Sequence, residues 1–147
     1  MFQGKVYKTG RFWIIEVPDL DLMTQGHTKE EAYDMLEDLL KTASNRDGFR
    51  PDIAKFRNNT FHLRGRDERS EKDLIAILLK RQRARAGLSL ADMTRLLKAK
   101  SKNSYARYEH GESVPSPIMM EKMLRVMGLT FEIRVRGRAL EEDSTAT

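Results

Sequence analysis

The stretch that decides the fold is Leu88–Gly111, which reads LSLADMTRLLKAKSKNSYARYEHG. Ser89 stands directly before a run of apolar residues at helical spacing, and Asp92 follows at the third helical position. A Ser hydroxyl at this place accepts a hydrogen bond from one of the free backbone N–H groups at a helix start. We therefore predict a short helix over Leu90–Leu97 that Ser89 caps.

A second short helix follows in the same stretch. It begins at Ser101 or Asn103 and ends at Gly111, because Gly adopts the left-handed conformation that ends many helices. Only Lys98–Ser101 separate it from the first helix, and two short helices joined in this way have the layout of a helix-turn-helix. Its predicted core consists of Leu88, Met93, Leu96, Leu97, Tyr105 and Tyr108.

Two further helices flank this pair. Ser70 is predicted to cap a helix over Glu71–Ala86, and Gly87 ends it. Ser116-Pro117 opens the last helix, since Pro at the first helical position loses no hydrogen bond, and this helix ends at Gly128. Together they predict a compact four-helix bundle.

The second helix of the pair carries side chains suited to reading DNA. In a helix-turn-helix the N-terminal part of this helix enters the major groove. There Asn pairs with adenine, and Arg or Lys pairs with guanine. Helix starts at Ser89 and Ser101 would present N–H groups to phosphates. The predicted DNA-binding residues are Ser89, Ser101, Lys102, Asn103, Ser104 and Arg107. The alternative is a helical bundle that shares only the pattern.

The charge of the chain supports this choice of segment. The chain has 27 Lys and Arg against 22 Asp and Glu, a net charge of +5. Residues 67–128 hold 13 of these cations and 8 of the anions, so that segment alone accounts for a charge of +5. This asymmetry indicates a polyanion-binding module beside a nearly neutral one. Within it, Lys80–Arg85 is either a phosphate-contacting run or an ordinary exposed face.

The first part of the chain has the pattern of strands followed by a helix. Lys5–Lys8 and Phe12–Val17 are rich in β-forming residues and flank a turn that contains Gly. Leu22–Gly26 is a third short strand. Thr28 then has capping-box spacing to Glu31 and opens a helix with its apolar residues on one face.

The remaining segments are assigned by composition and alternation. Residues 44–59 are polar and rich in turn residues, so we predict a loop with at most one turn around Ile53–Phe56. Thr60–Arg64 is a further strand, and Phe131–Arg136 alternates as a half-buried strand does.

The predicted fold class is α+β. Residues 1–66 form a small β-β-β-α-β domain, residues 67–136 an all-α helix-turn-helix domain with a short C-terminal strand, and residues 137–147 a flexible tail.

Two family resemblances follow from these motifs. Leu88–Met93, Asn103–Gly111 and Val114–Pro117 resemble the lambda-repressor-like (XRE) helix-turn-helix family over about residues 74–128. That resemblance implies that Glu109 is structural and that the exposed part of the helix before it reads DNA.

Phe12–Leu20 followed by Met23–Ala32 resembles the HicB domain: an aromatic strand ending in Pro-Asp-Leu, then Thr-Gln-Gly, then Thr-x-Glu-Glu-Ala. This resemblance implies a partial RNase H-like fold without nuclease activity. It also implies an antitoxin of a type II toxin–antitoxin pair that masks a HicA-type ribonuclease toxin and represses its own operon. Because an RNA-binding site is basic, acidic side chains are the candidates for toxin contact, with solvated surface charge as the alternative. The residues predicted to bind the toxin are Glu16, Asp19, Asp21, Glu30 and Asp34.

Other classes of function are not expected. The chain has no Cys, which excludes thiol catalysis and thiolate metal sites. Its three His are far apart in sequence and not at ligand spacing. We therefore expect no enzyme activity, metal or cofactor, and a cytoplasmic location without membrane contact. The alternative to the antitoxin is a stand-alone helix-turn-helix regulator whose first domain binds another protein or a ligand.

The chain is also expected to self-associate. Helix-turn-helix units usually act as dimers on two-fold sites, so a homodimer or homotetramer is predicted besides the toxin and operator DNA. The segment Phe131–Arg136 could pair with its copy in a second chain or dock within its own subunit.

Overall fold

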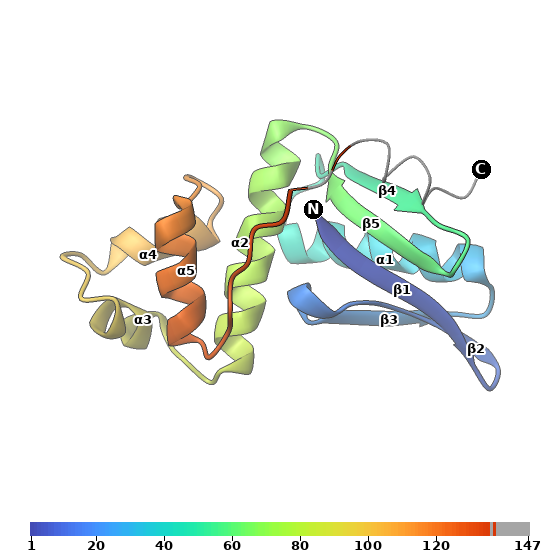
Figure 1. The fold of residues 1–147 in the computed structure, drawn as a ribbon, viewed down its shortest axis with the longest axis horizontal. Coiled ribbons are helices and arrows are strands. Elements are labelled where there is room, and N and C mark those ends of the chain that lie inside the picture. Colours follow the sequence, from blue (N-terminus) through green and yellow to red (C-terminus); the bar gives the residue numbers. More distant parts are fainter. Residues whose placement is uncertain (136, 138–147) are drawn as a thin grey trace.

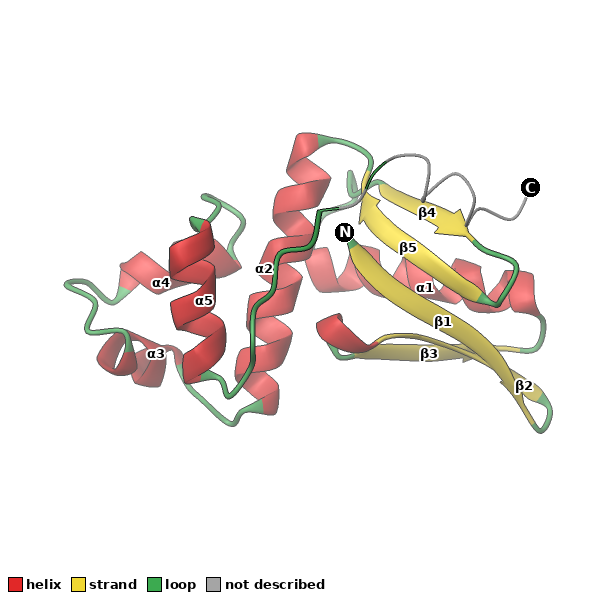
Figure 2. Ribbon diagram, in the orientation of Figure 1, coloured by secondary structure: helices red, strands yellow, loops and turns green. Residues whose placement is uncertain are grey.

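The computed structural model describes residues 1–135 and 137 (Figure 1). The described part is α+β, with a five-stranded antiparallel sheet and five α-helices (Figure 2). The sheet order is β3-β2-β1-β5-β4. The strands are β1 (Phe2–Thr9), β2 (Phe12–Val17), β3 (Leu22–Gly26), β4 (Pro51–Lys55) and β5 (Thr60–Gly65), with a 3-10 turn, η1 (Pro18–Leu20), between β2 and β3. The helices are α1 (Lys29–Ser44), α2 (Glu68–Arg85), α3 (Leu90–Leu96), α4 (Asn103–Glu109) and α5 (Pro117–Val126).

The helix α1 covers one face of the sheet (Figure 2). Its predicted cap is confirmed, because the Thr28 hydroxyl accepts a hydrogen bond from the Glu31 N–H at 3.0 Å. The Glu31 carboxylate reaches back to the His27 N–H at 3.1 Å. The predicted apolar face is confirmed as well, since Ala32, Leu36 and Leu40 are fully buried.

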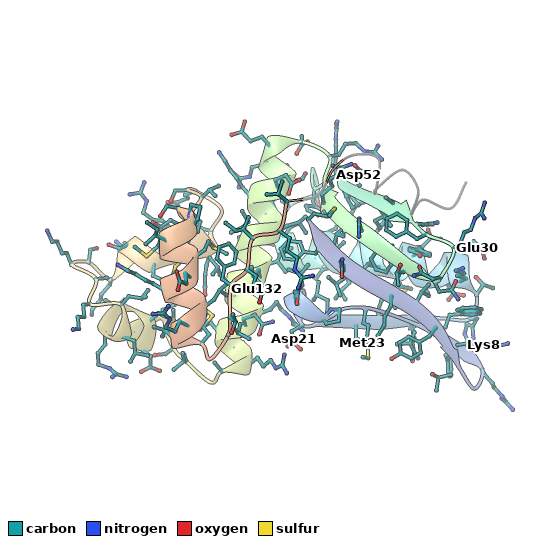
Figure 3. All side chains as sticks on the ribbon, viewed as in Figure 1. Lys8, Asp21, Met23, Glu30, Asp52 and Glu132 are labelled. Carbon is teal, nitrogen blue, oxygen red and sulfur yellow. The ribbon has the colours of Figure 1, made fainter. Side chains whose placement is uncertain are left out.

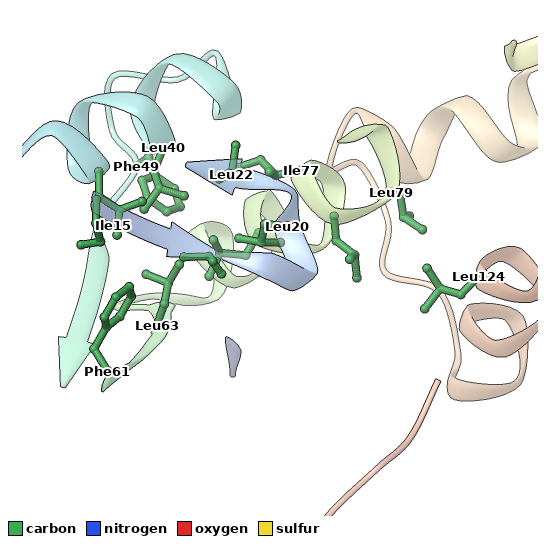
Figure 4. Close-up of a cluster of buried hydrophobic side chains, with 14 of the residues drawn as sticks. Ile15, Leu20, Leu22, Leu40, Phe49, Phe61, Leu63, Ile77, Leu79 and Leu124 are labelled. Carbon is green, nitrogen blue, oxygen red and sulfur yellow. The ribbon is translucent and has the colours of Figure 1, made fainter. Parts of the chain in front are cut away.

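The helix α2 packs against both parts of the molecule. It contacts β5, α1 and η1 on one side and α4 on the other. One cluster of buried side chains therefore runs from Ile15 and Phe61 in the sheet, through Ile77 and Leu79 of α2, to Leu124 of α5 (Figure 4). A single continuous helix that buries side chains against both parts therefore joins them. The predicted boundary at residues 66 and 67 stays a prediction.

Three expectations about these elements were wrong. Residues 51–55 form β4, which pairs with β5, where a loop was expected, because the register with β5 supplies hydrogen bonds that composition does not reveal. The helix α2 starts at Glu68, and its cap is Asp67, whose carboxylate accepts from the Ser70 N–H at 2.7 Å. Ser70 is instead buried and accepts a hydrogen bond from the Arg50 N–H at 2.9 Å.

Among the described residues, the expected C-terminal strand is not found. The described residues 129–135 are neither strand nor helix, because they pair with no neighbouring strand. Arg136 and residues 138–147, and with them nearly all of the predicted tail, lie outside the described residues.

Candidate nucleic-acid interface

The first helix of the motif, α3, has a different kind of cap at each of its two ends. The predicted cap at Ser89 is confirmed, since the Asp92 N–H donates to the Ser89 hydroxyl at 3.0 Å. The Ser89 N–H also donates to the Asp92 carboxylate at 2.8 Å, and this return bond completes a capping box. At the other end of α3, Lys98 takes the left-handed conformation with φ +53°. Its N–H and that of Ala99 bond back to the carbonyls of Arg95 and Thr94, so a lysine ends α3 where Gly is the usual residue.

The other helix ends follow the glycine rule. Gly87, Gly111 and Gly128 have positive φ, and each ends its helix with the same pair of backward hydrogen bonds. The predicted stops of α2, α4 and α5 are therefore confirmed. Lys98 was missed because a lysine carries no sequence signal for the left-handed conformation.

A buried ion pair fixes α4 against α2. The Arg83 guanidinium donates to both oxygens of the Glu109 carboxylate, at 2.6 and 3.1 Å. The Tyr105 hydroxyl donates to the same carboxylate at 2.8 Å, and Arg83 also donates to the Leu88 carbonyl at 2.9 Å. The Glu109 side chain is only 5% exposed. This network connects α2, α4 and the loop that precedes α3. Glu109 therefore has the structural role that was expected of it.

The electrostatics of this network follow from its geometry. The hydrogen bond to Glu109 raises the pKa of Arg83 above its ordinary value, because it stabilises the charged guanidinium. Burial, followed by the nearby Glu109 charge, raises the pKa of the Tyr105 hydroxyl well above its usual range. Tyr105 therefore remains a neutral donor at all physiological pH values.

The predicted DNA-reading side chains lie on one exposed end of the motif. Ser101, Lys102, Asn103, Ser104 and Arg107 are all exposed at or near the start of α4. The Ser101 hydroxyl accepts from the Asn103 N–H at 3.2 Å, and Arg107 makes only an exposed ion pair with Glu112 at 3.4 Å. Their side chains are thus free to turn toward a groove.

The core of the motif differs from the expectation at one residue. Met93 and Tyr105 are fully buried, and Leu88, Leu97 and Tyr108 pack on the core, as predicted. Leu96 is 40% exposed. Met93 and Leu97 are four residues apart and share the face of α3 that packs on the core, whereas Leu96 points away from that face.

Ser89 is less available than its neighbours on α4. Its N–H and its hydroxyl oxygen are both engaged in the capping box, so a phosphate contact there would use the hydroxyl hydrogen. Two exposed lysines of the turn, Lys98 and Lys100, lie between α3 and α4 and were not among the predicted DNA-binding residues. Their signal in the sequence is a pair of cations within the predicted turn.

The capping box predicts a pH dependence. Hydrogen bonds from Ser89, with a smaller contribution from Arg95, hold the pKa of Asp92 below its ordinary value. A carboxylate with a depressed pKa contributes stability above its unfolded pKa of about 3.9, and this contribution is lost as the pH falls through the lower folded value. We expect the difference in unfolding free energy between the wild type and Asp92→Asn to shrink as the pH falls below about 4. Urea unfolding from pH 5 to pH 2 measures it.

Ser89→Ala is the control for this pH effect. It removes the Ser89 hydroxyl, whose hydrogen bond to Asp92 is the second cause of the lowered pKa after the Ser89 backbone N–H, and should move the pKa of Asp92 part of the way back toward its ordinary value in an NMR titration. A stability difference that does not change with pH would contradict the assignment.

Part of the basic run on α2 makes contacts within the molecule. Arg83 pairs with Glu109. Gln82 is buried and donates to the Asp19 carbonyl at 2.7 Å, and Arg81 donates to the Asp21 carbonyl at 2.6 Å. Half of the run thus joins α2 to α4 and to η1. Lys80 and Arg85 have no ion pair in the part of the chain that is described.

The acidic residues predicted to bind a toxin do not form one cluster. Glu16 pairs with Lys5 at 3.1 Å, on the sheet face opposite α1. Asp19 and Asp21 lie at η1, next to α2, and Glu30 lies at the far end of the sheet (Figure 3). Glu30 and Asp34 are exposed on α1. The sequence places all five close together along the chain, whereas the fold spreads them over separate surfaces.

Other kinds of site lack support in the described residues. Among residues 1–135 and 137, no group of three His, Asp or Glu side chains is placed to hold a metal ion. No helix in the same part is long and apolar enough to cross a membrane.

The geometry of α2 to α5 is that of a helix-turn-helix DNA-binding domain. In agreement with it, residues 74–134 match a protein-family model described as "Helix-turn-helix domain". The match supports a DNA-binding regulator. Searches of curated proteins and of solved structures found no match to the chain.

Proposed function

We propose that the chain is an antitoxin and repressor: it masks a HicA-type ribonuclease toxin with its first part and represses its own operon with its helix-turn-helix. The DNA-binding half rests on one observation above all. Exposed Lys102, Asn103, Ser104 and Arg107 lie together on α4, a helix that the buried Arg83–Glu109 pair holds in place.

Each of these side chains would make a particular kind of contact with DNA. Asn103 offers a donor and an acceptor that match the edge of adenine, and Arg107 offers a fork that matches guanine. Lys98, Lys100 and Lys102 add phosphate contacts whose strength falls with salt. Base contacts then provide specificity, and phosphate contacts provide affinity and register.

Arg107→Ala is expected to weaken binding to operator DNA by about 1–3 kcal/mol and to relax the sequence preference, because a bidentate contact to a base is lost. Lys98→Ala is expected to weaken binding to all sequences alike and to lower the salt slope by about 1. Fluorescence anisotropy with duplexes from the upstream region, at several salt concentrations, measures both.

Arg11→Ala is the matched control for both variants. Arg11 is an exposed arginine in the β1–β2 turn, outside the helix-turn-helix, and its removal should leave affinity nearly unchanged. Equal affinities for the wild type and Arg107→Ala would remove Arg107 from the interface.

The masking half of the proposal is supported by the motifs of residues 12–32 and by the exposed carboxylates of Glu30 and Asp34. An inhibitor of this kind needs no catalytic group, only a surface that covers the substrate site of a basic ribonuclease. We accordingly propose a partial RNase H-like first domain without enzyme activity or cofactor, a cytoplasmic location, and a homodimer or homotetramer.

Co-expression with a small toxin encoded beside it tests the masking. The wild type is expected to restore growth, and the double variant Glu30→Lys/Asp34→Lys is expected to restore it less, because like charges would face the basic toxin. The double variant Asp47→Lys/Glu121→Lys, which reverses two exposed carboxylates outside the proposed contact surface, is the charge-matched control. Operator binding without growth rescue by the wild type would favour the alternative, a stand-alone regulator.

A further inference from the structure

The segment after α5 has the properties of an unpaired strand. Leu129 makes the last backbone bond of the α5 end, from its N–H to the Leu124 carbonyl at 2.8 Å. Phe131 packs against the core, and the chain then continues to residue 135 outside any helix or strand. Residues 130–135 make no backbone–backbone hydrogen bond within the described part. Backbone N–H and C=O groups that lack ladder partners are a template for pairing with another strand.

Side chains alternate along this segment. Phe131 is half-buried against the core, while Ile133 and Val135 are 66% and 95% exposed. Glu132 and Arg134 are exposed and reach each other, with 3.4 Å between the Arg134 guanidinium and the Glu132 carboxylate. The apolar row Phe131, Ile133 and Val135 thus begins at the core and continues into solvent.

Two copies of residues 131–135 can pair in antiparallel orientation with opposite charges facing each other. In an antiparallel pair centred on Ile133, Glu132 of one strand stands opposite Arg134 of the other, and Phe131 stands opposite Val135. Opposite charges at facing positions stabilise a strand pair, and like charges destabilise it. A parallel pair in register would place Glu132 beside Glu132 and Arg134 beside Arg134.

We propose that a second copy of this chain pairs here, through an antiparallel two-stranded ribbon over residues 131–135 with its two-fold axis at Ile133. This deepens the self-association within the proposed function by naming the surface. The pairing is isologous, so it closes as a dimer. It supplies the missing backbone partners and covers Ile133 and Val135, and Phe131 attaches the ribbon to both cores. Because the segment follows α5 directly, the ribbon links two helix-turn-helix units, as a two-fold operator requires.

Single cysteines test the register, since the chain has none of its own. Ile133→Cys places two thiols opposite each other, at roughly 5 Å between Cβ atoms, and a short bis-maleimide should crosslink it to a dimer. In Val135→Cys the two thiols are four residues apart along the ribbon, roughly 13 Å, and crosslinking should be at least about tenfold slower. Val135 is the more exposed side chain, so random collision would give the opposite order.

Charge exchange provides the second measurement. In sedimentation equilibrium of the full chain without DNA, Glu132→Arg and Arg134→Glu should each raise the dimer Kd about tenfold or more, and the double exchange should restore it. A monomeric wild type, or equal crosslinking of both cysteine variants, would overturn the proposal. Either result leaves DNA binding by the single helix-turn-helix standing, so the two failures are distinguishable.

Discussion

Glu109→Ala is expected to lower the free energy of unfolding by about 3–5 kcal/mol, because it leaves the Arg83 guanidinium, which is largely shielded from water, without its partner. The Arg83 and Glu109 side chains are only 17% and 5% exposed, so water cannot replace the lost carboxylate well. The Tyr105 hydroxyl loses its acceptor in the same step. For a chain of this size the melting temperature should fall by roughly 6–20 °C in a thermal unfolding scan.

Two variants make this prediction specific. Glu112→Ala removes an exposed carboxylate from the same region, where the pair with Arg107 has side chains 63% and 54% exposed, and should cost no more than about 1 kcal/mol. Arg83→Met/Glu109→Met removes both charges together and should recover much of the loss, since the desolvated charge disappears. A Glu109→Ala protein as stable as Glu112→Ala would show that the buried pair does not hold α4.

Gly65→Ala is expected to destabilise the protein by about 3 kcal/mol through a clash between β5 and α2. A methyl group at Gly65 would lie within 2.5 Å of the Ser70 carbonyl carbon and even closer to the Glu71 backbone nitrogen. Backbone cannot turn away as a flexible side chain does, so α2 must move. Urea unfolding measures the loss, and operator affinity should fall with it because α2 also supports α4.

Gly10→Asn is the control for Gly65→Ala. Gly10 has φ +60° in the β1–β2 turn, with no neighbouring atom within 4 Å of an added Cβ, and Asn tolerates that conformation. Its effect should be within about 0.5 kcal/mol. If Gly65→Ala lowers the free energy of unfolding no more than Gly10→Asn does, β5 and α2 are not in the close contact described.

The features that could be predicted from the sequence depend on neighbours along the chain. The Ser89–Asp92 capping box, the Thr28 cap and the three glycine stops involve groups within five residues of one another. The placement of Lys102, Asn103, Ser104 and Arg107 on an exposed helix followed from the same local signals.

The features that could not be predicted depend on distant partners. β4 is a strand because it pairs with β5, and the described residues of the predicted C-terminal strand pair with none in the single chain. Ser70 looked like a cap, yet its hydroxyl bonds Arg50 across the interface between the sheet and α2. In the basic run on α2, only the fold decides that Arg83 meets Glu109 while Lys80 stays exposed.

The sequence by itself determined the α+β class, the caps at Thr28 and Ser89, the glycine stops of three helices and the chemistry of the side chains on α4, because propensity, capping and periodicity act over a few residues. Only the tertiary structure decided that α2 belongs to both halves, that Arg83, Tyr105 and Glu109 form one network, and that the five acidic residues do not share one surface. Those features arise from burial and pairing between residues that are distant in the chain, and no local pattern carries that information.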